Sequence, residues 1–438
     1  MWVFRYFLSI TCAYLLNNIT MRIENAFDAV RSQICNVCNV FNTCWIDNNK
    51  YEVISVPRRV IEVNIPVRMD NGEINIFQWF RSQHNDARGP FKGGIRFHQN
   101  VSRDEVKALS IWMSIKTALV NIPLWGAKWW VMVNPKKLSA WELERLSRWY
   151  VREIYKYLGP DIDIPAPDVN TTPEIMAWMM DEYSKLVGTY SPGSFTWKPL
   201  CAGGSQWRDT ATAQGWLYVL EKILEFHNEK ISWKKIILQG AGNAGLTIAK
   251  LLDSAWAILV WISDSWGAIY NSNGLEIDKI STLKSHKKSV IEYDWVQKLS
   301  DPCEVLISKC DILIPAALST QITSKNADKI QASWILELAN GPVTPDADII
   351  LKEKWIHVIP DILANAWGVI VSYFEQVQNN TNFYWEDVEI NEKLYKKMIE
   401  SATMVEKERI LYDATYRWAA YSIALKRIFD AMHARGEI

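Results

Sequence analysis

The sequence is short of glycine, cysteine and net charge, and it has no long uncharged apolar run. Only 19 of its 438 residues are glycine and seven are cysteine. So few cysteines do not build a disulfide scaffold. The cluster of Cys35, Cys38 and Cys44 has no second ligand pair at zinc spacing, so we expect no metal. The formal net charge of −1 gives no electrostatic reason to expect a nucleic-acid partner.

The N-terminal segment, residues 1–20, is apolar but is interrupted by Arg5. Its longest uncharged run, residues 6–20, is too short to span a bilayer. Its basic region is thin, and no clear cleavage site of a secretion signal follows. We expect this segment to be a leader or, preferably, the product of a start codon assigned upstream of the true start at Met21. We expect a cytoplasmic protein with no membrane partner.

The remaining chain predicts two α/β halves, because 438 residues exceed one ordinary core. In the first half, residues 60–67 and 74–81 alternate as two strands joined at Asn71-Gly72. Ser139 is expected to cap a helix, and Pro173 suits the first turn of another. In the second half, short apolar strands alternate with helices, which predicts a parallel sheet. The expected helices are 103–119, 139–157, 172–185, 209–228, 243–254, 391–412 and 414–435, and the expected strands of the second half are 235–239, 258–263, 312–315 and 334–338.

A glycine pattern opens the second sheet. Gly240, Gly242 and Gly245 follow a predicted strand and begin a helix, and Asp264 lies 19 residues further on. This context is typical of a dinucleotide fingerprint, in which the pyrophosphate meets free N–H groups at the helix N-terminus. Asp264 would bind the adenosine ribose, which favours NAD; alternatively it is a turn residue at the end of a strand.

Three segments of the first half carry the residues for chemistry. They read RSQHNDARGPFKGGIRFH (81–98), KTALVNIPLWGAKWWV (116–131) and PAPDVNT (165–171). The third places Asp168 after two prolines that stiffen a loop. Oxidative deamination needs a cation for the substrate carboxylate, a lysine of lowered pKa to activate water, and a carboxylate to carry protons. The three lysines of these segments, with Asp168, are candidates for these roles.

From about Pro57 to the C-terminus the chain resembles hexameric glutamate dehydrogenases of the Glu/Leu/Phe/Val dehydrogenase family. The motifs QHNDARGPFKGGIRFH, KTALVNIP, PAPDVNT, MAWMMDEYSKLVG, DILIPAAL, ANGPVTPDAD and VSYFEQVQN carry the resemblance. It implies an α/β substrate-binding and oligomerisation domain (21–200), a Rossmann-type dinucleotide domain (201–366) and C-terminal helices (367–438) that return to the first domain. It also implies reversible oxidative deamination of L-glutamate to 2-oxoglutarate and ammonium with NAD or NADP, by a homo-oligomer, expected to be a hexamer.

The same resemblance assigns roles to individual residues. Lys128 would be the catalytic lysine in a glycine-rich loop, and Asp168 the acid that transfers protons. Lys116 would bind the substrate α-carboxylate. The side-chain carboxylate would be bound by Lys92 with Ser372. The remaining assignments are Asn365 at the substrate, and Arg208, Thr212, Gly240, Gly242, Asn243, Gly245, Asp264 and Asn340 at the cofactor.

Lys92 is the residue that decides the substrate. Leucine, phenylalanine and valine dehydrogenases resemble this chain too, but their pattern has an apolar residue at this position. A buried cation beside an apolar substrate would cost on the order of several kcal/mol, whereas a second carboxylate would pair with it. Glutamate is therefore preferred, and a leucine-, phenylalanine- or valine-type enzyme is the alternative.

Tryptophan, in contrast to glycine, is unusually abundant, with 23 residues. Twelve of them stand where the resemblance leads us to expect glycine. They are Trp79, Trp125, Trp129, Trp130, Trp141, Trp197, Trp207, Trp216, Trp233, Trp256, Trp355 and Trp367. Glycine serves where φ is positive or where backbone approaches a ligand, and a dozen overpacked indoles at roughly 1–3 kcal/mol each would exceed a typical total stability.

Decoding offers an explanation for this substitution. UGA is read as tryptophan in one variant code and as glycine in some bacterial lineages. We hypothesise that the natural protein has glycine at most of these positions, which UGG codons at Trp125, Trp129 and Trp130 would contradict. If the tryptophans are real, a catalytically dead homologue is the alternative.

Overall fold

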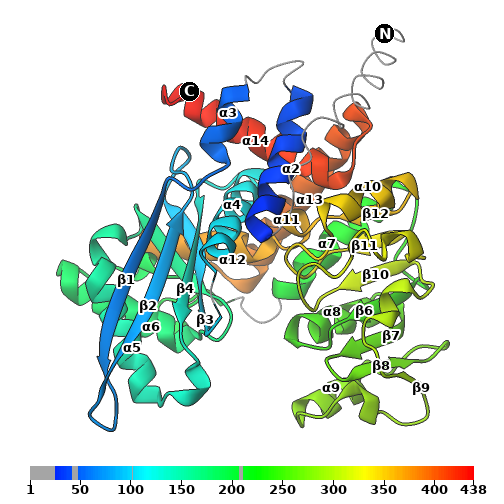
Figure 1. Cartoon of the computed structure of the whole chain (residues 1–438), viewed down its shortest axis with the longest axis horizontal. Coiled ribbons are helices and arrows are strands. Elements are labelled where there is room, and N and C mark those ends of the chain that lie inside the picture. The colour runs from blue at the N-terminus through cyan, green and yellow to red at the C-terminus, as the bar shows by residue number, and fades with distance from the viewer. Residues whose placement is uncertain (1–24, 42–47, 101, 207–210) are drawn as a thin grey trace. The chain divides into compact units, whose positions relative to one another are not determined.

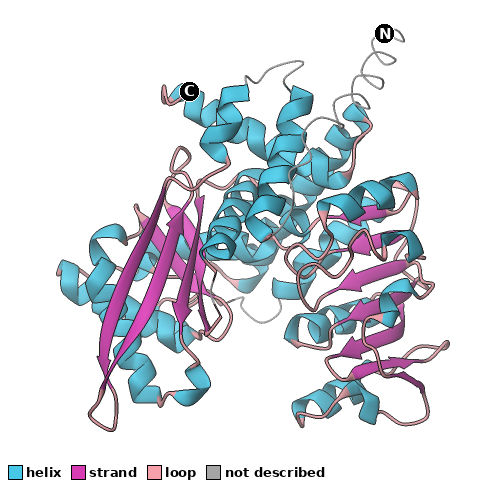
Figure 2. Ribbon diagram, in the orientation of Figure 1, coloured by secondary structure: helices cyan, strands magenta, loops and turns pink. Residues whose placement is uncertain are grey.

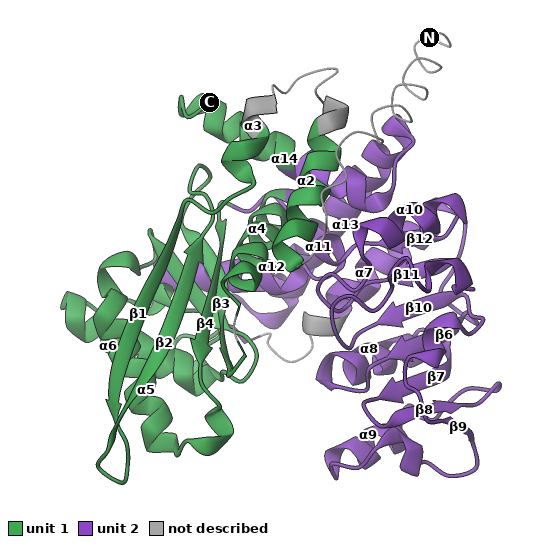
Figure 3. Cartoon of the chain, viewed as in Figure 1, with its two compact units in different colours: residues 1–118, 123–204, 425–438 green, residues 119–122, 205–424 purple. Residues whose placement is uncertain are grey.

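The computed structural model describes residues 25–41, 48–100, 102–206 and 211–438. The expected start at Met21 and the segment 1–20 therefore lie outside the described residues. The chain forms two compact units (Figure 3). Unit 1 comprises residues up to 118, 123–204 and 425–438, and unit 2 comprises 119–122 and 205–424. None of the described helices has the length and apolar character needed to cross a membrane.

Unit 1 is built on a five-stranded mixed sheet with the order β1-β2-β4-β3-β5 (Figure 1). The predicted hairpin is present: β1 pairs antiparallel with β2 through the turn at Gly72, where φ is +88°. Ser139 caps α5 in a capping box with Glu142, and Thr172 caps α6. The elements are α2 (Ala26–Phe41), α3 (Asn48–Ile54), β1 (Arg59–Arg68), β2 (Ile74–Gln83), β3 (Phe91–His98), α4 (Arg103–Leu119), β4 (Trp125–Met132), α5 (Ala140–Ile154), β5 (Asp163–Pro167) and α6 (Pro173–Val187).

Each of the three chemical segments of the first half contains part of a strand, whereas two of them were predicted as loops. Lys128 lies within β4, and the prolines before Asp168 belong to β5. β5 is an edge strand, the position at which a sheet tolerates proline because a missing N–H breaks no ladder. The expectation of a loop around Lys128 and before Asp168 was therefore wrong.

The sheet of unit 1 has a different covering on each face. Ile95, Phe97, Trp129 and Val131 point to a core that α5 and α6 complete. On the other face, Trp130 packs with residues of α4. Because side chains alternate along a strand, the even-numbered residues of β3 and β4 lie on the α4 face.

Unit 2 is built on a seven-stranded sheet with the order β12-β11-β10-β6-β7-β8-β9 (Figure 1). Its strands are drawn in magenta in Figure 2. Its first five strands pair in parallel, as the alternation of strands and helices predicted, and β8 and β9 add an antiparallel edge. Most of α14 is in unit 1, but its first turns are in unit 2. The elements are α7 (Ala211–Phe226), β6 (Lys235–Gln239), α8 (Asn243–Ser254), β7 (Ile258–Asp264), β8 (Gly267–Tyr270), α9 (Ile277–Ser285), β9 (Gln297–Leu299), β10 (Ile312–Pro315), β11 (Trp334–Leu336), α10 (Pro345–Glu353), β12 (His357–Ile359), α11 (Asp361–Ala364), α12 (Trp367–Thr381), α13 (Asp387–Tyr412) and α14 (Tyr416–Ala434).

Candidate active site

The polar centre of unit 1 lies where β3, β4 and β5 run side by side. β3 pairs in parallel with both neighbours. Lys92 of β3 and Lys128 of β4 are on the α4 face of the sheet, and Asp168 follows β5 directly. A Cβ on Gly126 would lie 2.0 Å from a backbone oxygen of α4. Glycine at this position therefore lets α4, which carries Lys116, approach the strand closely.

Lys128 and Asp168 form an ion pair between Nζ and Oδ2. The loop that carries Asp168 is held by Thr171, whose Oγ1 accepts the Asp168 N–H at 2.7 Å and donates to the Ile95 carbonyl at 2.9 Å. The two residues expected to perform the chemistry are therefore in contact.

Arg96 is a third member of this centre that the sequence analysis missed. Its Nε lies 3.1 Å from Asp168 Oδ2. The period of two along β3 would have found it, because Lys92, Gly94 and Arg96 share one face of the strand. A Cβ on Gly94 would lie 2.8 Å from the Asp168 Cβ, so the small residue between the two cations leaves room for the acid.

Burial and neighbouring charges change the pKa values of Lys128 and Asp168. Burial lowers the pKa of Lys128 to about 8, Asp168 opposes that change, and Arg96 and Lys116 add to it. Burial alone would raise the pKa of Asp168, but Lys128 and Arg96 hold it well below its usual range. At neutral pH the site thus holds an ionised Asp168 beside Lys128, whose pKa lies close to neutral, the range that suits a general base.

Lys92 is buried, with 1% of its surface exposed. Its ammonium donates to Thr196 Oγ1 at 2.8 Å and to the Ile164 carbonyl at 3.2 Å. Thr196 was not predicted from the sequence; it precedes Trp197 in a segment without a recognisable motif. Lys116 is also buried, on α4, and its charge acts on Lys128.

The glycine loop of unit 2 fits a dinucleotide pyrophosphate. Gly240 has φ of +108°, which a larger residue rarely adopts. A Cβ on Gly245 would lie 2.0 Å from the Gly240 carbonyl oxygen, whereas a Cβ on Gly242 would meet no protein atom within 4 Å. Asn243 begins α8, whose cap Gly242 offers no side chain to the first N–H groups. These groups remain available to an anion.

Asp264 is engaged by protein donors. Its carboxylate accepts hydrogen bonds from Lys284 Nζ at 2.8 Å, the Val290 N–H at 2.9 Å, the Trp266 N–H at 2.9 Å and the Ser289 hydroxyl at 3.0 Å. Burial would raise the pKa of Asp264, but Lys284 and the N–H groups of Trp266 and Val290 lower it. This arrangement supports a turn residue that joins β7 to its neighbours rather than a ribose-binding acid.

The other residues assigned from the resemblance are spread over unit 2. Asn340 is exposed in the loop after β11, and Asn365 Nδ2 donates to the Leu338 carbonyl of that loop at 2.9 Å. Ser372 is buried on α12, and Thr212 is in the first turn of α7. Arg208 lies outside the described residues. The described residues contain no group of three or more His, Cys, Asp or Glu side chains that could hold a metal ion.

Comparison with known proteins identifies the family. A model of the Glu/Leu/Phe/Val dehydrogenase dimerisation domain matches residues 57–185, and a model of glutamate/leucine/phenylalanine/valine dehydrogenase matches residues 203–436. The chain belongs to this dehydrogenase family. The resemblance and the α/β fold class with a Rossmann-type domain, both expected from the sequence, are thus confirmed.

Individual relatives cover nearly the whole chain. The catabolic NAD-specific glutamate dehydrogenase of Bacillus subtilis is 47% identical, over 88% of this chain and 91% of its own. The NADP-specific glutamate dehydrogenase of Synechocystis is 44% identical, over 89% and 93%. The glutamate dehydrogenase structure from Peptoniphilus asaccharolyticus has a TM-score of 0.82 at 40% identity and covers 94% of this chain and 100% of its own. A hetero-hexameric glutamate dehydrogenase from Thermus thermophilus has a TM-score of 0.87 at 31% identity, over 94% and 97%.

Indoles fill the core beside the catalytic strands. Trp79 stacks on Tyr150 with ring centroids 3.7 Å apart, and Trp129 meets the same tyrosine edge-on at 4.6 Å. Among the described residues, no hydrogen-bond acceptor reaches the buried indole N–H of Trp79, Trp125 or Trp129. An unsatisfied buried donor costs about 1–3 kcal/mol. These three tryptophans are therefore poorly suited to their surroundings.

Other tryptophans occupy left-handed backbone. Trp197, Trp233, Trp256, Trp295 and Trp355 all have φ between +59° and +67°. Bulky residues rarely adopt this conformation, which is typical of glycine. Four of these five belong to the twelve tryptophans at expected glycine positions, and Trp295 is a further position of the same kind. In contrast, Trp125, Trp129 and Trp130 are in strand β4, where crowding rather than positive φ is the difficulty.

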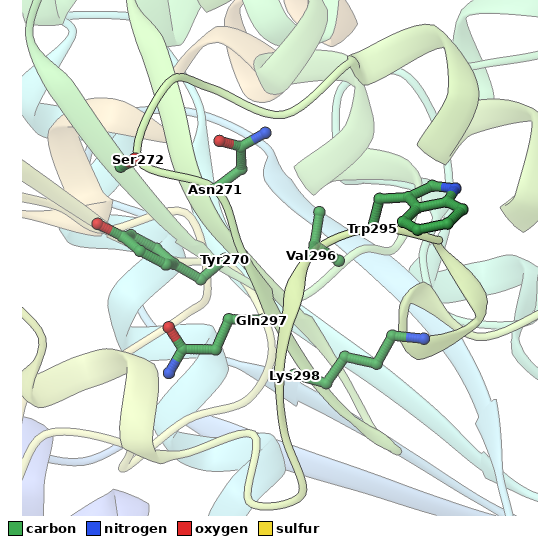
Figure 4. A pocket seen from close by; sticks show the side chains of 7 residues that line it. All are labelled: Tyr270, Asn271, Ser272, Trp295, Val296, Gln297 and Lys298. Atoms are coloured by element: carbon green, nitrogen blue, oxygen red, sulfur yellow. The ribbon is translucent and has the colours of Figure 1, made fainter.

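The pocket in Figure 4 lies at the antiparallel edge of unit 2 and has a volume of about 640 Å³. Residues of β8, β9 and the segments beside them line it, including Tyr270, Gln297 and Lys298. Trp295, which is fully exposed, forms part of its rim. No residue assigned to catalysis or to the cofactor lines this pocket.

Proposed function

We infer that the chain catalyses the reversible oxidative deamination of L-glutamate to 2-oxoglutarate and ammonia with NAD or NADP. The enzyme class, the reaction and both cofactors predicted from the sequence are confirmed by relatives named NAD-specific and NADP-specific glutamate dehydrogenases. The leucine-, phenylalanine- or valine-type alternative is not favoured. The observation in the structure that carries the proposal is the contact of Asp168 with the buried Lys128.

The residues of unit 1 divide the chemistry among them. Asp168, which is ionised, takes a proton from the substrate ammonium. Lys128 in its neutral form takes a proton from water, and the resulting hydroxide adds to the iminium carbon to give a carbinolamine. Asp168 then returns its proton to the amine nitrogen, the C–N bond breaks to release ammonia, and the carbinolamine hydroxyl loses its proton to become the carbonyl of 2-oxoglutarate. Arg96 keeps the carboxylate of Asp168 oriented through its 3.1 Å contact. When bound, NAD or NADP supplies the hydride acceptor.

The two buried lysines would hold the substrate. We propose that Lys116 binds the α-carboxylate and that Lys92, with Ser372, binds the side-chain carboxylate. The hydrogen bonds of Lys92 to Thr196 and Ile164 fix its ammonium. A rigid buried cation favours a dicarboxylate over an apolar amino acid, because the charge-assisted bond forms only with the former.

The test compares Lys92→Leu with Lys107→Leu. Lys107 is a lysine of α4 that pairs with Asp104 near the surface. Loss of a charge-assisted bond of about 3 kcal/mol predicts a fall of roughly 100-fold in kcat/KM for glutamate in Lys92→Leu. The same variant should gain activity on leucine, and Lys107→Leu should change neither value. Wild-type enzyme that prefers leucine would overturn the proposal.

We propose that the enzyme is a homo-oligomer, specifically a hexamer, in the cytoplasm, with residues 21–200, 201–366 and 367–438 as its functional divisions. The relative from Thermus thermophilus is a hetero-hexamer, which supports the number of subunits. Among the described residues β1 is an edge strand, and Ile74 and Ile76 of the neighbouring strand β2 are exposed. An open sheet edge beside exposed apolar side chains is a surface that subunits can cover. Light scattering of the purified protein tests the mass.

A further inference from the structure

A buried ionic network lies in unit 2 beneath the loop that follows β11. Arg417, in the first turn of α14, donates to both carboxylate oxygens of Glu337 at 2.6 and 3.1 Å. It also donates to Asp348 of α10 at 3.3 Å and lies 3.7 Å from Asp361, the first residue of α11. The side chain of Arg417 is 5% exposed, and that of Glu337 is fully buried.

This network is attached directly to the backbone of the loop 338–341. Glu337 is the residue before the loop, and its carboxylate accepts the Asp361 N–H at 2.9 Å. Asp361 in turn accepts the Gly341 N–H at 3.0 Å. Arg417 therefore reaches both ends of a four-residue loop through one carboxylate at each end.

The loop carries a residue assigned to the cofactor and contacts another assigned residue. Asn340 is the exposed residue between the two anchored ends, and Asn365 binds the Leu338 carbonyl at 2.9 Å. The loop leaves the carboxyl end of a parallel strand, the edge at which open α/β sheets bind their ligands. Gly341 has φ of +56°, so the chain turns sharply next to Asn340.

Stability alone is a weak reason for such a network. Taking an arginine and three carboxylates out of water is costly, and well-packed apolar residues often replace buried ion pairs without loss. What a bidentate arginine provides beyond an apolar cluster is fixed direction. The arrangement is therefore better explained by the precision it imposes on the loop.

We propose that Arg417 is a positioning residue for the dinucleotide, acting through Glu337 and Asp361 to hold the loop 338–341 so that Asn340 faces the cofactor. The proposal rests on the dehydrogenase function inferred above. It adds that the first turn of the last helix, distant in sequence from the glycine fingerprint, helps to form the cofactor site.

The experiment measures NADH and NADPH binding directly, by quenching of protein fluorescence, together with thermal unfolding and steady-state kinetics. Arg417→Met should weaken binding of the preferred cofactor about 10-fold or more, with the KM for glutamate within about twofold of wild type. Arg417→Lys, which keeps the charge but not the bidentate geometry, should recover part of the loss. Glu337→Gln is measured in the same way and replaces Arg417→Met if that variant does not fold.

The matched control is Arg427→Met, on the same helix. Arg427 donates to the backbone of Ala118 at 2.9 Å and is not part of the network. It should lower the unfolding temperature and leave cofactor binding unchanged. Equal cofactor dissociation constants for wild type, Arg417→Met and Glu337→Gln would overturn the proposal. Because binding is measured without glutamate, a wild-type enzyme that binds NADH but does not oxidise glutamate would refute the proposed function alone.

Discussion

Replacing Trp256 and Trp355 by glycine should make the protein more stable, although each change removes a large side chain. Both residues follow the end of a helix with φ of +64° and +59°. The N–H of Trp256 bonds to the Asp253 carbonyl, and that of Ala257 to the Leu252 carbonyl. This is the Schellman motif, in which the left-handed residue is usually glycine. Trp355 repeats it with bonds to the last turn of α10.

The magnitude follows from the backbone and the exposure. A non-glycine residue in left-handed conformation costs roughly 1–2 kcal/mol. Glycine gives back about 0.4–1 kcal/mol through the greater freedom of the unfolded chain. Trp256 is 70% exposed and Trp355 is 84% exposed, so little packing is lost. The net gain is about 1 kcal/mol for each site and about 2 kcal/mol for the double variant.

The assay is thermal unfolding with a matched control. One kcal/mol shifts Tm by about 2–4 °C in a unit of roughly 150–250 residues, so the double variant should unfold about 4–8 °C higher. The control is Trp266→Gly, which has 72% exposure but no positive φ. It gains no strain relief and should lower Tm slightly. If Trp256→Gly and Trp355→Gly behave like Trp266→Gly, the strain argument and its support for glycine at these positions are refuted.

Three further predictions concern Lys128 of unit 1 and the cofactor-binding residues proposed for unit 2. The pKa of Lys128 is about 8, so the fraction of neutral amine increases as pH rises through that value, and a pH–rate series should show kcat/KM for glutamate oxidation rising with it. In Lys128→Met, kcat/KM should fall by roughly 10²–10⁴-fold. Gly245→Ala should destabilise the fold, because its Cβ would lie 2.0 Å from the Gly240 carbonyl oxygen. Gly242→Ala should keep Tm, because its Cβ would meet no protein atom within 4 Å, and should weaken NADH binding, because we expect the pyrophosphate to lie against this glycine. Asp264→Asn should lower Tm and leave the ratio of kcat/KM for NAD and NADP unchanged; a changed ratio would restore the ribose-binding role.

Turn, cap and proline residues in the sequence correctly predicted the helices and strands whose ends these residues determine. The turn at Asn71-Gly72, the cap at Ser139 and the proline after Thr172 all act within a few residues, and the structure places each as expected. Strand β6 and the start of α8 agree because the glycine turn between them leaves few alternatives.

The catalytic strands escaped prediction for a reason that is not local. β3, β4 and β5 are buried between helices and pair mainly with segments far away in the sequence. Their lysines, glycines and prolines obscure the apolar alternation by which strands are recognised. Arg96 was missed because β3, whose period of two would have revealed it, was not predicted. Thr196 was missed because it contacts Lys92 from an irregular segment 104 residues further along the chain.

The tryptophans at expected glycine positions lie in unrelated structural environments. Trp256 ends a helix in left-handed backbone, Trp129 is buried in a strand with an unsatisfied N–H, and Trp216 lies in a helix where its indole donates to Asn365 at 2.6 Å. Adaptation would place different residues at sites with such different demands. Only glycine meets the first two through small size and a free φ. A single cause acting on one codon explains a common residue at unrelated sites, whereas selection on packing does not.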